Sequence, residues 1–217
     1  MAERDVSATG PTLALVSERL AQHAQTVESE AGVTQRAAVA VVLRDANGDG
    51  GGGGGLELLL IKRAEHESDP WSGHVALPGG REEPFDASLE ETAVRETWEE
   101  TGLDLRRDGR ILGVLDELHP RSAPVPVLVR PYVATVRRDA PLALSEEVAA
   151  AFWVPLSTFT APDASVESTV IARGAEGGAS ERRVPSYRHG EYVVWGMTER
   201  ILRQFITLVG ASHPSQF

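Results

Sequence analysis

Residues 77–103 read LPGGREEPFDASLEETAVRETWEETGL, and this stretch decides the fold. It begins with Pro-Gly-Gly at residues 78–80, which is typical of a loop that ends a strand. Ser88 with Glu91 forms a capping-box pattern, which predicts that a helix begins just after Ser88. Gly102 supplies a left-handed stop at the other end. The stretch therefore predicts a helix of about four turns between two tight loops.

Three carboxylates gather on one face of this expected helix. Glu96 and Glu100 are four residues apart and Glu99 is three from Glu96, so all three fall within one turn. Like charges at this spacing destabilise a helix, whereas Mg²⁺ or Mn²⁺ prefers converging oxygen ligands. Arg95 beside them can clamp one carboxylate with two hydrogen bonds. A solvated acidic face is the plain alternative, and the two framing loops favour the metal site over it.

The composition narrows the classes of protein that remain. The chain has 217 residues, 21 Lys+Arg, 32 Asp+Glu, a net charge of −11 and no cysteine. The absence of cysteine excludes disulfides, thiolate nucleophiles and cysteine-based zinc sites. The negative charge argues against binding a nucleic-acid polymer. No apolar run approaches the roughly 20 residues of a membrane span, and no signal-peptide pattern begins the chain, so a cytoplasmic protein is expected.

Apolar periodicity predicts the elements around the central stretch. Strands are expected at residues 37–43, 56–61, 110–118 and 126–136, and helices at 12–28, 146–151 and 192–209. Residues 161–183 are rich in Ala, Ser, Gly and charge and are expected to form an irregular loop. The glycines at 50–55 are expected to cap a long hairpin. We expect one domain over residues 12–209, with a disordered segment at 1–11 and a flexible tail at 210–217.

The central stretch resembles the Nudix hydrolase signature, Gly-x5-Glu-x7-Arg-Glu-U-x-Glu-Glu-x-Gly-U, in which U is a bulky aliphatic residue. The second half matches from Arg95 to Leu103, except that Thr97 stands at the first U position. The first half departs by one residue, because Gly80 lies fifteen residues before Arg95 rather than fourteen. Asp86 stands where the signature has its first Glu.

This variant of the signature is most similar to the coenzyme A pyrophosphatase branch of the family. Thr-Ala-Val-Arg-Glu at residues 92–96 and Leu-Leu-Ile-Lys-Arg at 59–63 belong to that layout. The branch also has Leu-Arg-x-His-x-Gly before the signature, and this chain instead has ESDPWSGH at 67–74. That segment is one residue longer and lacks the Arg and the His, so other substrates stay open.

The resemblance implies an α/β fold, namely an α/β/α sandwich with a mixed sheet and the signature helix on one face. It implies that water attacks phosphorus in a nucleoside diphosphate linked to another moiety, with Mg²⁺ or Mn²⁺ as cofactor. By position in the signature, the Gly80 carbonyl, Glu96, Glu99 and Glu100 would be the metal ligands. Arg95 would orient Glu99.

Three further residues are candidates outside the signature. Glu147 is a candidate general base, because many relatives carry a loop glutamate before the strand that here contains Trp-Val-Pro at 153–155. An acid favoured at a helix start is the alternative. Arg63 and Arg81 are candidate contacts for the diphosphate, and each can equally be a surface cation.

Several functions remain open at this stage. Coenzyme A or a derivative is the first expected substrate, and ADP-ribose, a dinucleotide or another nucleotide derivative is the alternative. A non-catalytic module that binds a nucleotide or regulates a partner is a second class, although such modules usually lose signature glutamates and all three are present here. An isoprenyl diphosphate isomerase is associated with a cysteine, which this chain lacks. Homodimers are common among relatives, so a homodimer is the suggested assembly.

Overall fold

The computed structural model describes residues 10–29, 32–46, 55–66, 71–119, 125–173 and 179–210. The expected hairpin tip at residues 50–55 lies outside the described part except for Gly55, and so do most of the two expected terminal segments. The helices are α1 (Leu13–Gln22), α2 (Leu89–Thr101), α3 (Ser157–Thr160) and α4 (Gly196–Gly210). The strands are β1 (Gln35–Asp45), β2 (Leu56–Arg63), β3 (Val75–Ala76), β4 (Gly79–Arg81), β5 (Gly109–Val114), β6 (Val127–Val136), β7 (Val148–Pro155), β8 (Ser165–Arg173), β9 (Ala179–His189) and β10 (Tyr192–Trp195).

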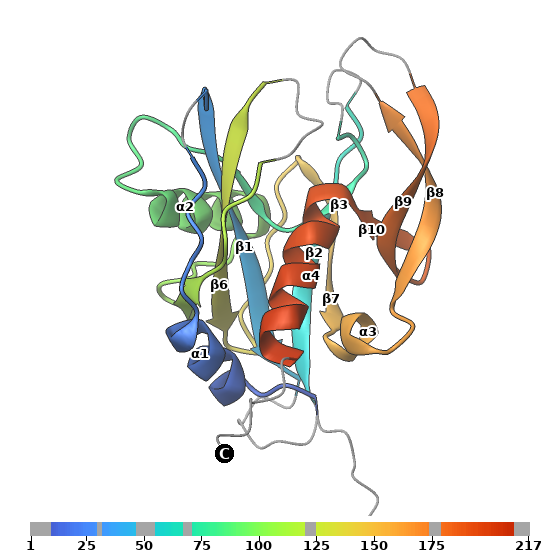
Figure 1. Ribbon diagram of the computed structural model, residues 1–217. Helices are drawn as coiled ribbons and strands as arrows, with labels where there is room; N and C mark the ends of the chain where they lie inside the picture. The colour runs from blue at the N-terminus through green and yellow to red at the C-terminus, as the bar shows by residue number, and fades with distance from the viewer. Residues whose placement is uncertain are drawn as a thin grey trace, which may run out of the picture.

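A mixed sheet forms the centre of the molecule (Figure 1). Its strand order is β3-β2-β1-β6-β5, with β4 also paired to β1 and β7 to β2. The pair β1–β6 is parallel, whereas β2, β4 and β5 join their neighbours antiparallel. Of the described helices, α2 packs on one face, and α1 and α4 pack on the other. The expected α/β/α sandwich is confirmed.

Strand β1 is buried on both faces, and its alternating side chains explain how the layers approach each other. Val39 and Val41 belong to the core beneath α1 and α4, while Ala38 lies beneath α2 and packs with Ala93. Side chains along a strand point to opposite faces in turn. The small residue on the α2 side therefore lets that helix lie close to the sheet, which positions the side chains of α2 against β4.

Helix α2 begins and ends where its capping residues predict. The Ser88 Oγ accepts a hydrogen bond from the Glu91 N–H at 3.3 Å, and Gly102 closes the helix with φ of 73°. A Cβ at position 102 would lie 2.8 Å from the Ala143 side chain, so both the positive φ and the available space require glycine. The strands expected at 37–43, 56–61, 110–118 and 126–136 are present as β1, β2, β5 and β6 with small shifts at their ends.

The expected C-terminal helix is wrong over its first four residues. Tyr192–Trp195 forms β10, which pairs antiparallel with β9, and α4 begins only at Gly196. Val193 and Val194 fit an apolar helix face as well as a strand, because both periods place apolar residues there. Gly196 has φ of 69° and turns the chain from the strand into the helix.

Two other expectations are wrong for a similar reason. Residues 146–147 form a turn and Val148–Pro155 is a strand, because these residues pair with β2 rather than coil into a helix. Within residues 161–183, the described part forms a short turn, β8 and the first part of β9 instead of an irregular loop. Helix α1 also ends at Gln22, six residues before the expected end. Cross-strand pairing decides the first two segments, and their local composition does not reveal it.

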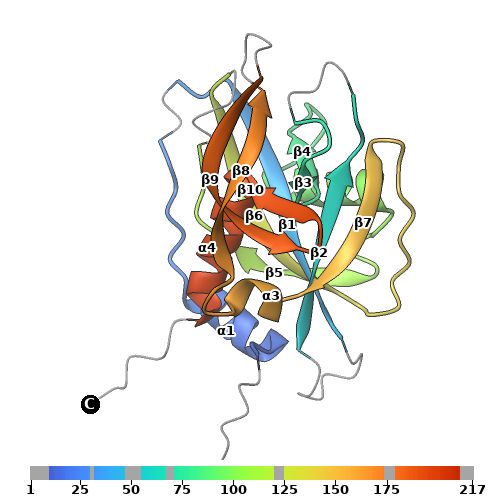
Figure 2. The ribbon, with the colours of Figure 1, turned by 90° about the vertical axis from the view of Figure 1, so that its right-hand side faces the viewer.

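The strands β8, β9 and β10 form a second, antiparallel sheet of order β10-β9-β8 (Figure 2). The Tyr187 ring of β9 meets the Phe159 ring of α3 edge-on, with centroids 5.4 Å apart. Both rings are buried and join the core beneath α4. The second sheet is thereby attached to the side of the sandwich opposite to α2. Within the described residues, no helix is both long and apolar enough to cross a membrane.

Candidate active site

The carboxylates of α2 lie directly against the Pro-Gly-Gly loop and β4. The Gly79 N–H donates a hydrogen bond to Glu100 Oε2 at 2.9 Å. A Cβ at Gly80 would lie 2.3 Å from the Glu96 carboxyl carbon, so only glycine leaves room for this carboxylate. The glycines of β4 and the carboxylates of Glu96 and Glu100 are therefore held side by side.

Arg95 is the centre of the polar network on α2. Its Nε and Nη2 bind both oxygens of Asp86 at 3.0 and 2.9 Å. Its Nη1 donates to Glu96 Oε1 at 3.0 Å and to Glu99 Oε2 at 2.9 Å, and Nη2 also donates to the Arg81 carbonyl at 3.0 Å. One guanidinium thus fixes two of the three glutamates that are expected to bind metal and ties them to β4.

The paired charges shift the ionisation of this network. The hydrogen bonds from Arg95 hold the pKa of Asp86 down at about 2, and Asp86 in turn raises the pKa of Arg95. The Asp86 side chain is 3% exposed and also accepts a hydrogen bond from Thr92 Oγ1 at 2.9 Å. Asp86 is therefore charged and fully engaged, which makes it an anchor for Arg95.

The pKa of Glu100 is raised, whereas that of Asp86 is lowered. Burial of Glu100 raises its pKa to about 7, against the Gly79 N–H and the Arg63 guanidinium, which both lower it. The charges of Glu96 and Glu147 raise it further. Burial likewise raises the pKa of Glu96, with smaller contributions from the charges of Glu99 and Glu147. The carboxylates of the α2 glutamates and of Glu147 therefore repel one another within one small region.

Glu147 reaches this region from a different part of the chain. It lies in the turn before β7, and its carbonyl accepts a hydrogen bond from the Ala64 N–H at 2.8 Å. That bond fixes the turn at the end of β2, next to Arg63. Arg63 Nη1 is 3.7 Å from Glu100 Oε1. The structure thus brings together Arg63, Glu100 and Glu147, which are far apart in the sequence.

The donor set fits a hard divalent cation. Carboxylates and a loop carbonyl are the oxygen ligands that Mg²⁺ and Mn²⁺ prefer. The buried Glu100 and the half-buried Glu96, both with raised pKa values, form an acidic environment that a cation would neutralise. In the described part of the chain, no three acidic or histidine side chains already converge as a finished metal site, since Arg95 holds Glu96 and Glu99 through hydrogen bonds.

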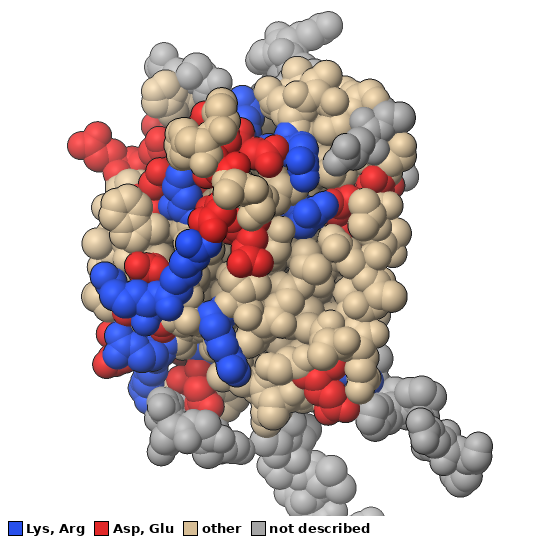
Figure 3. All heavy atoms as spheres, turned by 90° about the vertical axis from the view of Figure 1, so that its left-hand side faces the viewer, with Lys and Arg blue, Asp and Glu red and all other residues tan. Residues whose placement is uncertain are grey.

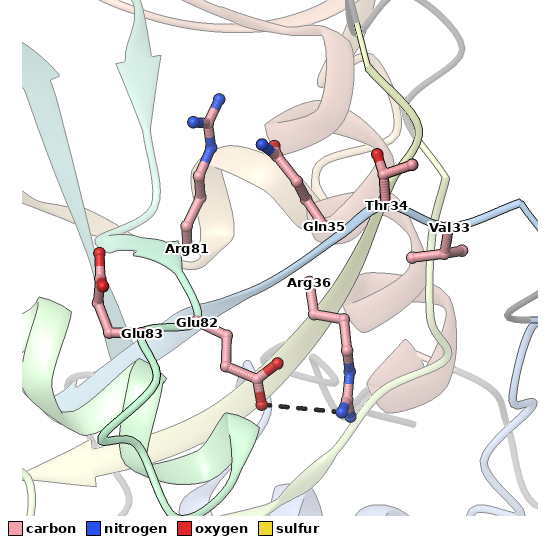
Figure 4. A pocket seen from close by; sticks show the side chains of 7 residues that line it. All are labelled: Val33, Thr34, Gln35, Arg36, Arg81, Glu82 and Glu83. Atoms are coloured by element: carbon pink, nitrogen blue, oxygen red, sulfur yellow. Dashed lines mark ion pairs between the residues drawn. The ribbon is translucent and has the colours of Figure 1, made fainter.

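Arg81 faces away from this cluster. Its side chain is exposed and, with Gln35, Arg36 and Glu82, lines a hollow of about 390 Å³ at the start of β1 (Figure 4). Two of the lining residues form an ion pair, in which Arg36 Nη1 lies 3.7 Å from Glu82 Oε1 (dashed line in Figure 4). The surface toward α2 carries acidic and basic side chains next to one another rather than a uniformly acidic face (Figure 3).

Sequence reasoning missed two contacts of the site. The first is the contact of Asp86 with Arg95, and Asp86 stands out in the sequence only because it departs from the signature. The second is the contact between Arg63 and Glu100, which joins β2 to α2. A loop conformation creates the first contact and sheet packing creates the second. Neither has a periodic pattern, and only the position of Asp86 within the signature could have indicated its role.

Comparisons with known proteins find one family. The model of the NUDIX domain family matches residues 34–173. The uncharacterized Nudix hydrolase NudL of Enterobacter is 34% identical over 155 residues, which are 70% of this chain and 75% of that protein. A peroxisomal coenzyme A diphosphatase of Caenorhabditis elegans is 35% identical over 127 residues, which are 58% of this chain and 50% of that protein.

The likeness extends to solved structures. A MutT/nudix family protein from Enterococcus faecalis superposes with a TM-score of 0.54 at 21% identity, over 92% of this chain and 70% of that chain, which is a likeness of fold. Some relatives are much longer than the matched region. The chain spans half of the worm protein and 34% of a relative from Schizosaccharomyces pombe.

Proposed function

The chain belongs to the Nudix family, and from this premise we propose that it hydrolyses the diphosphate linkage of a nucleoside diphosphate joined to another moiety, with Mg²⁺ or Mn²⁺ as cofactor. The observation that carries the proposal is the acidic cluster of α2. Glu100 is buried and Glu96 is half-buried against the glycines of β4, and Arg95 fixes Glu96 and Glu99. A helix that only faced solvent would gain nothing from withdrawing two carboxylates with raised pKa values from water.

Glu96, Glu99, Glu100 and the Gly80 carbonyl would hold the metal. A divalent cation, when bound, neutralises the charge of the diphosphate and lowers the pKa of water. Arg95 keeps Glu96 and Glu99 in place, and Asp86 keeps Arg95 in place through its two hydrogen bonds. Positioning contacts of this kind typically contribute about 10- to 100-fold to metal affinity or activity.

Glu147 is the proposed general base. It lies in an exposed turn whose charge acts on both Glu96 and Glu100, so it borders the metal-binding cluster without being buried in it. A carboxylate in this position can take the proton from the water that attacks phosphorus. Arg63, at 3.7 Å from Glu100, is close enough to contact the diphosphate at the same place. Arg81 is the more distant candidate, at the hollow beyond β4.

We propose coenzyme A or a derivative as the substrate. Two observations favour it, namely the name of the worm relative and the Thr-Ala-Val-Arg-Glu sequence at residues 92–96. Hydrolysis would give 3′,5′-ADP and a phosphopantetheine. ADP-ribose and dinucleotides carry the same linkage, and the segment at 67–74 differs from the coenzyme A branch, so these compounds are the alternative.

The test is a panel of coenzyme A, ADP-ribose and a diadenosine polyphosphate, each with Mg²⁺ and with Mn²⁺ and with products resolved by mass. We expect metal-dependent cleavage, with coenzyme A turned over fastest. Equal and feeble turnover of every compound would refute coenzyme A as the substrate. No cleavage of any compound with either metal would refute the hydrolase.

A further inference from the structure

A second hollow lies between the main sheet and the second sheet. It has a volume of about 320 Å³, and its walls include Lys62, His74, Glu191, Tyr192 and Trp195. Lys62 is the neighbour of Arg63 in β2. The Arg63 N–H also donates a hydrogen bond to the His74 carbonyl at 3.0 Å. Because consecutive side chains of a strand point to opposite faces, the hollow lies across β2 from Arg63 and Glu100, where β2 pairs with β3.

Aromatic rings form one wall of the hollow. The rings of His74 and Trp195 have centroids 4.7 Å apart at an angle of 56°. Tyr192 stacks on Phe152 with centroids 4.4 Å apart, which fixes the orientation of its ring. Tyr192 and Trp195 are only half-buried, so part of each ring remains accessible. Accessible rings held by other rings are suited to stack on a planar heterocycle.

The hollow also contains the only lysine of the chain. Lys62 is half-buried, and it forms no ion pair with any residue that the structure describes. An ammonium group in this condition is suited to bind a phosphate. Glu191 lies exposed among the lining residues, where its carboxylate can accept a hydrogen bond from a ribose hydroxyl or an exocyclic amine.

We propose that this hollow binds the nucleotide part of the substrate, with the base stacked on the ring of Trp195 and a phosphate of the same nucleotide at Lys62. This inference rests on the proposed function and adds to it the place where the nucleotide lies. The wall made by β10 follows residue 173, where the match to the family model ends. Residues outside the shared domain thus contribute to the choice of substrate.

The test is the binding of AMP, measured by calorimetry on the full chain in EDTA, where no hydrolysis takes place. We expect the wild-type protein to bind AMP and to bind adenosine and ribose 5-phosphate each about tenfold more weakly, because each lacks one of the two contacts. Trp195→Leu and Lys62→Met should each weaken AMP binding by about tenfold or more. Trp195→Phe and Lys62→Arg retain the ring and the charge and should restore most of the affinity.

Two matched variants control for general effects. Trp98→Leu removes an exposed tryptophan of α2, and Arg182→Met removes an exposed cation of β9, and neither should change AMP binding. Thermal unfolding of each variant shows that it is folded. Wild-type protein that does not bind AMP, or equal AMP affinity in wild type, Trp195→Leu and Lys62→Met, would overturn the inference.

The design separates this inference from the proposed function. AMP binding that depends on Trp195 and Lys62, together with no cleavage of any panel compound, would refute the hydrolase and retain the nucleotide site. Metal-dependent cleavage of coenzyme A together with AMP binding that ignores both residues would retain the hydrolase and refute the nucleotide site.

Discussion

The region around α2 and the second sheet differ in how the sequence encodes them. Around α2, charged side chains are joined in one network, and Arg95 alone contacts Asp86, Glu96 and Glu99. Short-range signals specify this region, because Ser88 and Gly102 cap the helix and the glutamates repeat at helical spacing. The sequence predicts it well for that reason.

The second sheet has no such local signals. Its strand β8 is largely exposed, and Ile171 is 66% exposed. Pairing between strands holds it together, as in the buried hydrogen bond of 2.8 Å between Ser186 Oγ and Ser168 Oγ. The comparison teaches that ion pairs organise the region around α2, whereas pairing between strands holds the second sheet together. Substitutions in the two regions should therefore have different consequences.

The largest effect is expected at Glu100. Glu100→Gln removes a proposed metal ligand but can retain the hydrogen bond from the Gly79 N–H, so the fold should survive. We expect kcat to fall by about 10³-fold or more, because the loss acts on the charge that develops in the transition state. Steady-state turnover of the best panel substrate measures this. Glu90→Gln changes an exposed glutamate of the same helix and should leave turnover unchanged; unchanged turnover in Glu100→Gln would contradict the site.

A slightly smaller effect is expected at Glu147. Glu147→Gln removes the proposed general base, for which a loss of about 10²- to 10⁴-fold in kcat is typical. Glu146→Gln alters the exposed neighbour in the same turn and serves as the matched control. Equal kcat values for the two variants would assign the base to another residue.

Asp86→Asn tests the anchor of Arg95. It removes the charge that Arg95 binds through two hydrogen bonds, so Arg95 should hold Glu96 and Glu99 less firmly. We expect a decrease of about 10- to 100-fold in kcat, with weaker activation by Mn²⁺. Asp139→Asn, at a side chain that is 79% exposed, is the control. An Asp86→Asn enzyme that responds to Mn²⁺ as wild type does would show that Arg95 needs no anchor.

The raised pKa of Glu100 predicts a pH dependence of stability. Its pKa in the folded protein is about 7, above the usual glutamate value of 4.5. Between these values the folded state binds more protons than the unfolded state, so the free energy of unfolding decreases as the pH rises. Without metal, the decrease from about pH 4.5 to about pH 7 should reach up to about 3 kcal/mol.

Urea unfolding in EDTA at several pH values measures this dependence. The Glu100→Gln variant lacks the titrating group, so its stability should decrease less over the same range. A wild-type profile that runs parallel to that of Glu100→Gln would show that Glu100 ionises normally in the folded protein.

The smallest effect is expected in the second sheet. Ser186→Ala removes a buried hydroxyl that bonds to Ser168 Oγ at 2.8 Å and to the Val166 carbonyl at 3.1 Å. We expect the free energy of unfolding to fall by about 1 kcal/mol and Tm by about 2–4 °C. Calorimetry detects this, and kcat should not change. Ser180→Ala, at an exposed position of β9, is the control. A large loss of kcat would show that the second sheet takes part in the chemistry.

The parts of the site that follow from local pattern were predictable. The ends of α2 follow from Ser88 and Gly102, and the acidic face follows from the spacing of its glutamates. The contact of Arg63 with Glu100 was not predictable, because it depends on how β2 and α2 pack. Strand β10 was not predictable either, because Val193 and Val194 satisfy a helical and a strand period alike.

The central claim is that the glutamates of α2 are gathered to hold a divalent cation. Its most direct measurement is a titration of the protein with Mn²⁺, followed by the electron paramagnetic resonance signal of the free ion, for wild type and for the double variant Glu96→Gln/Glu100→Gln. We predict that wild type removes free Mn²⁺ from solution and that the double variant, folded as judged by its unfolding transition, does not. Equal Mn²⁺ binding by the two proteins would contradict the claim.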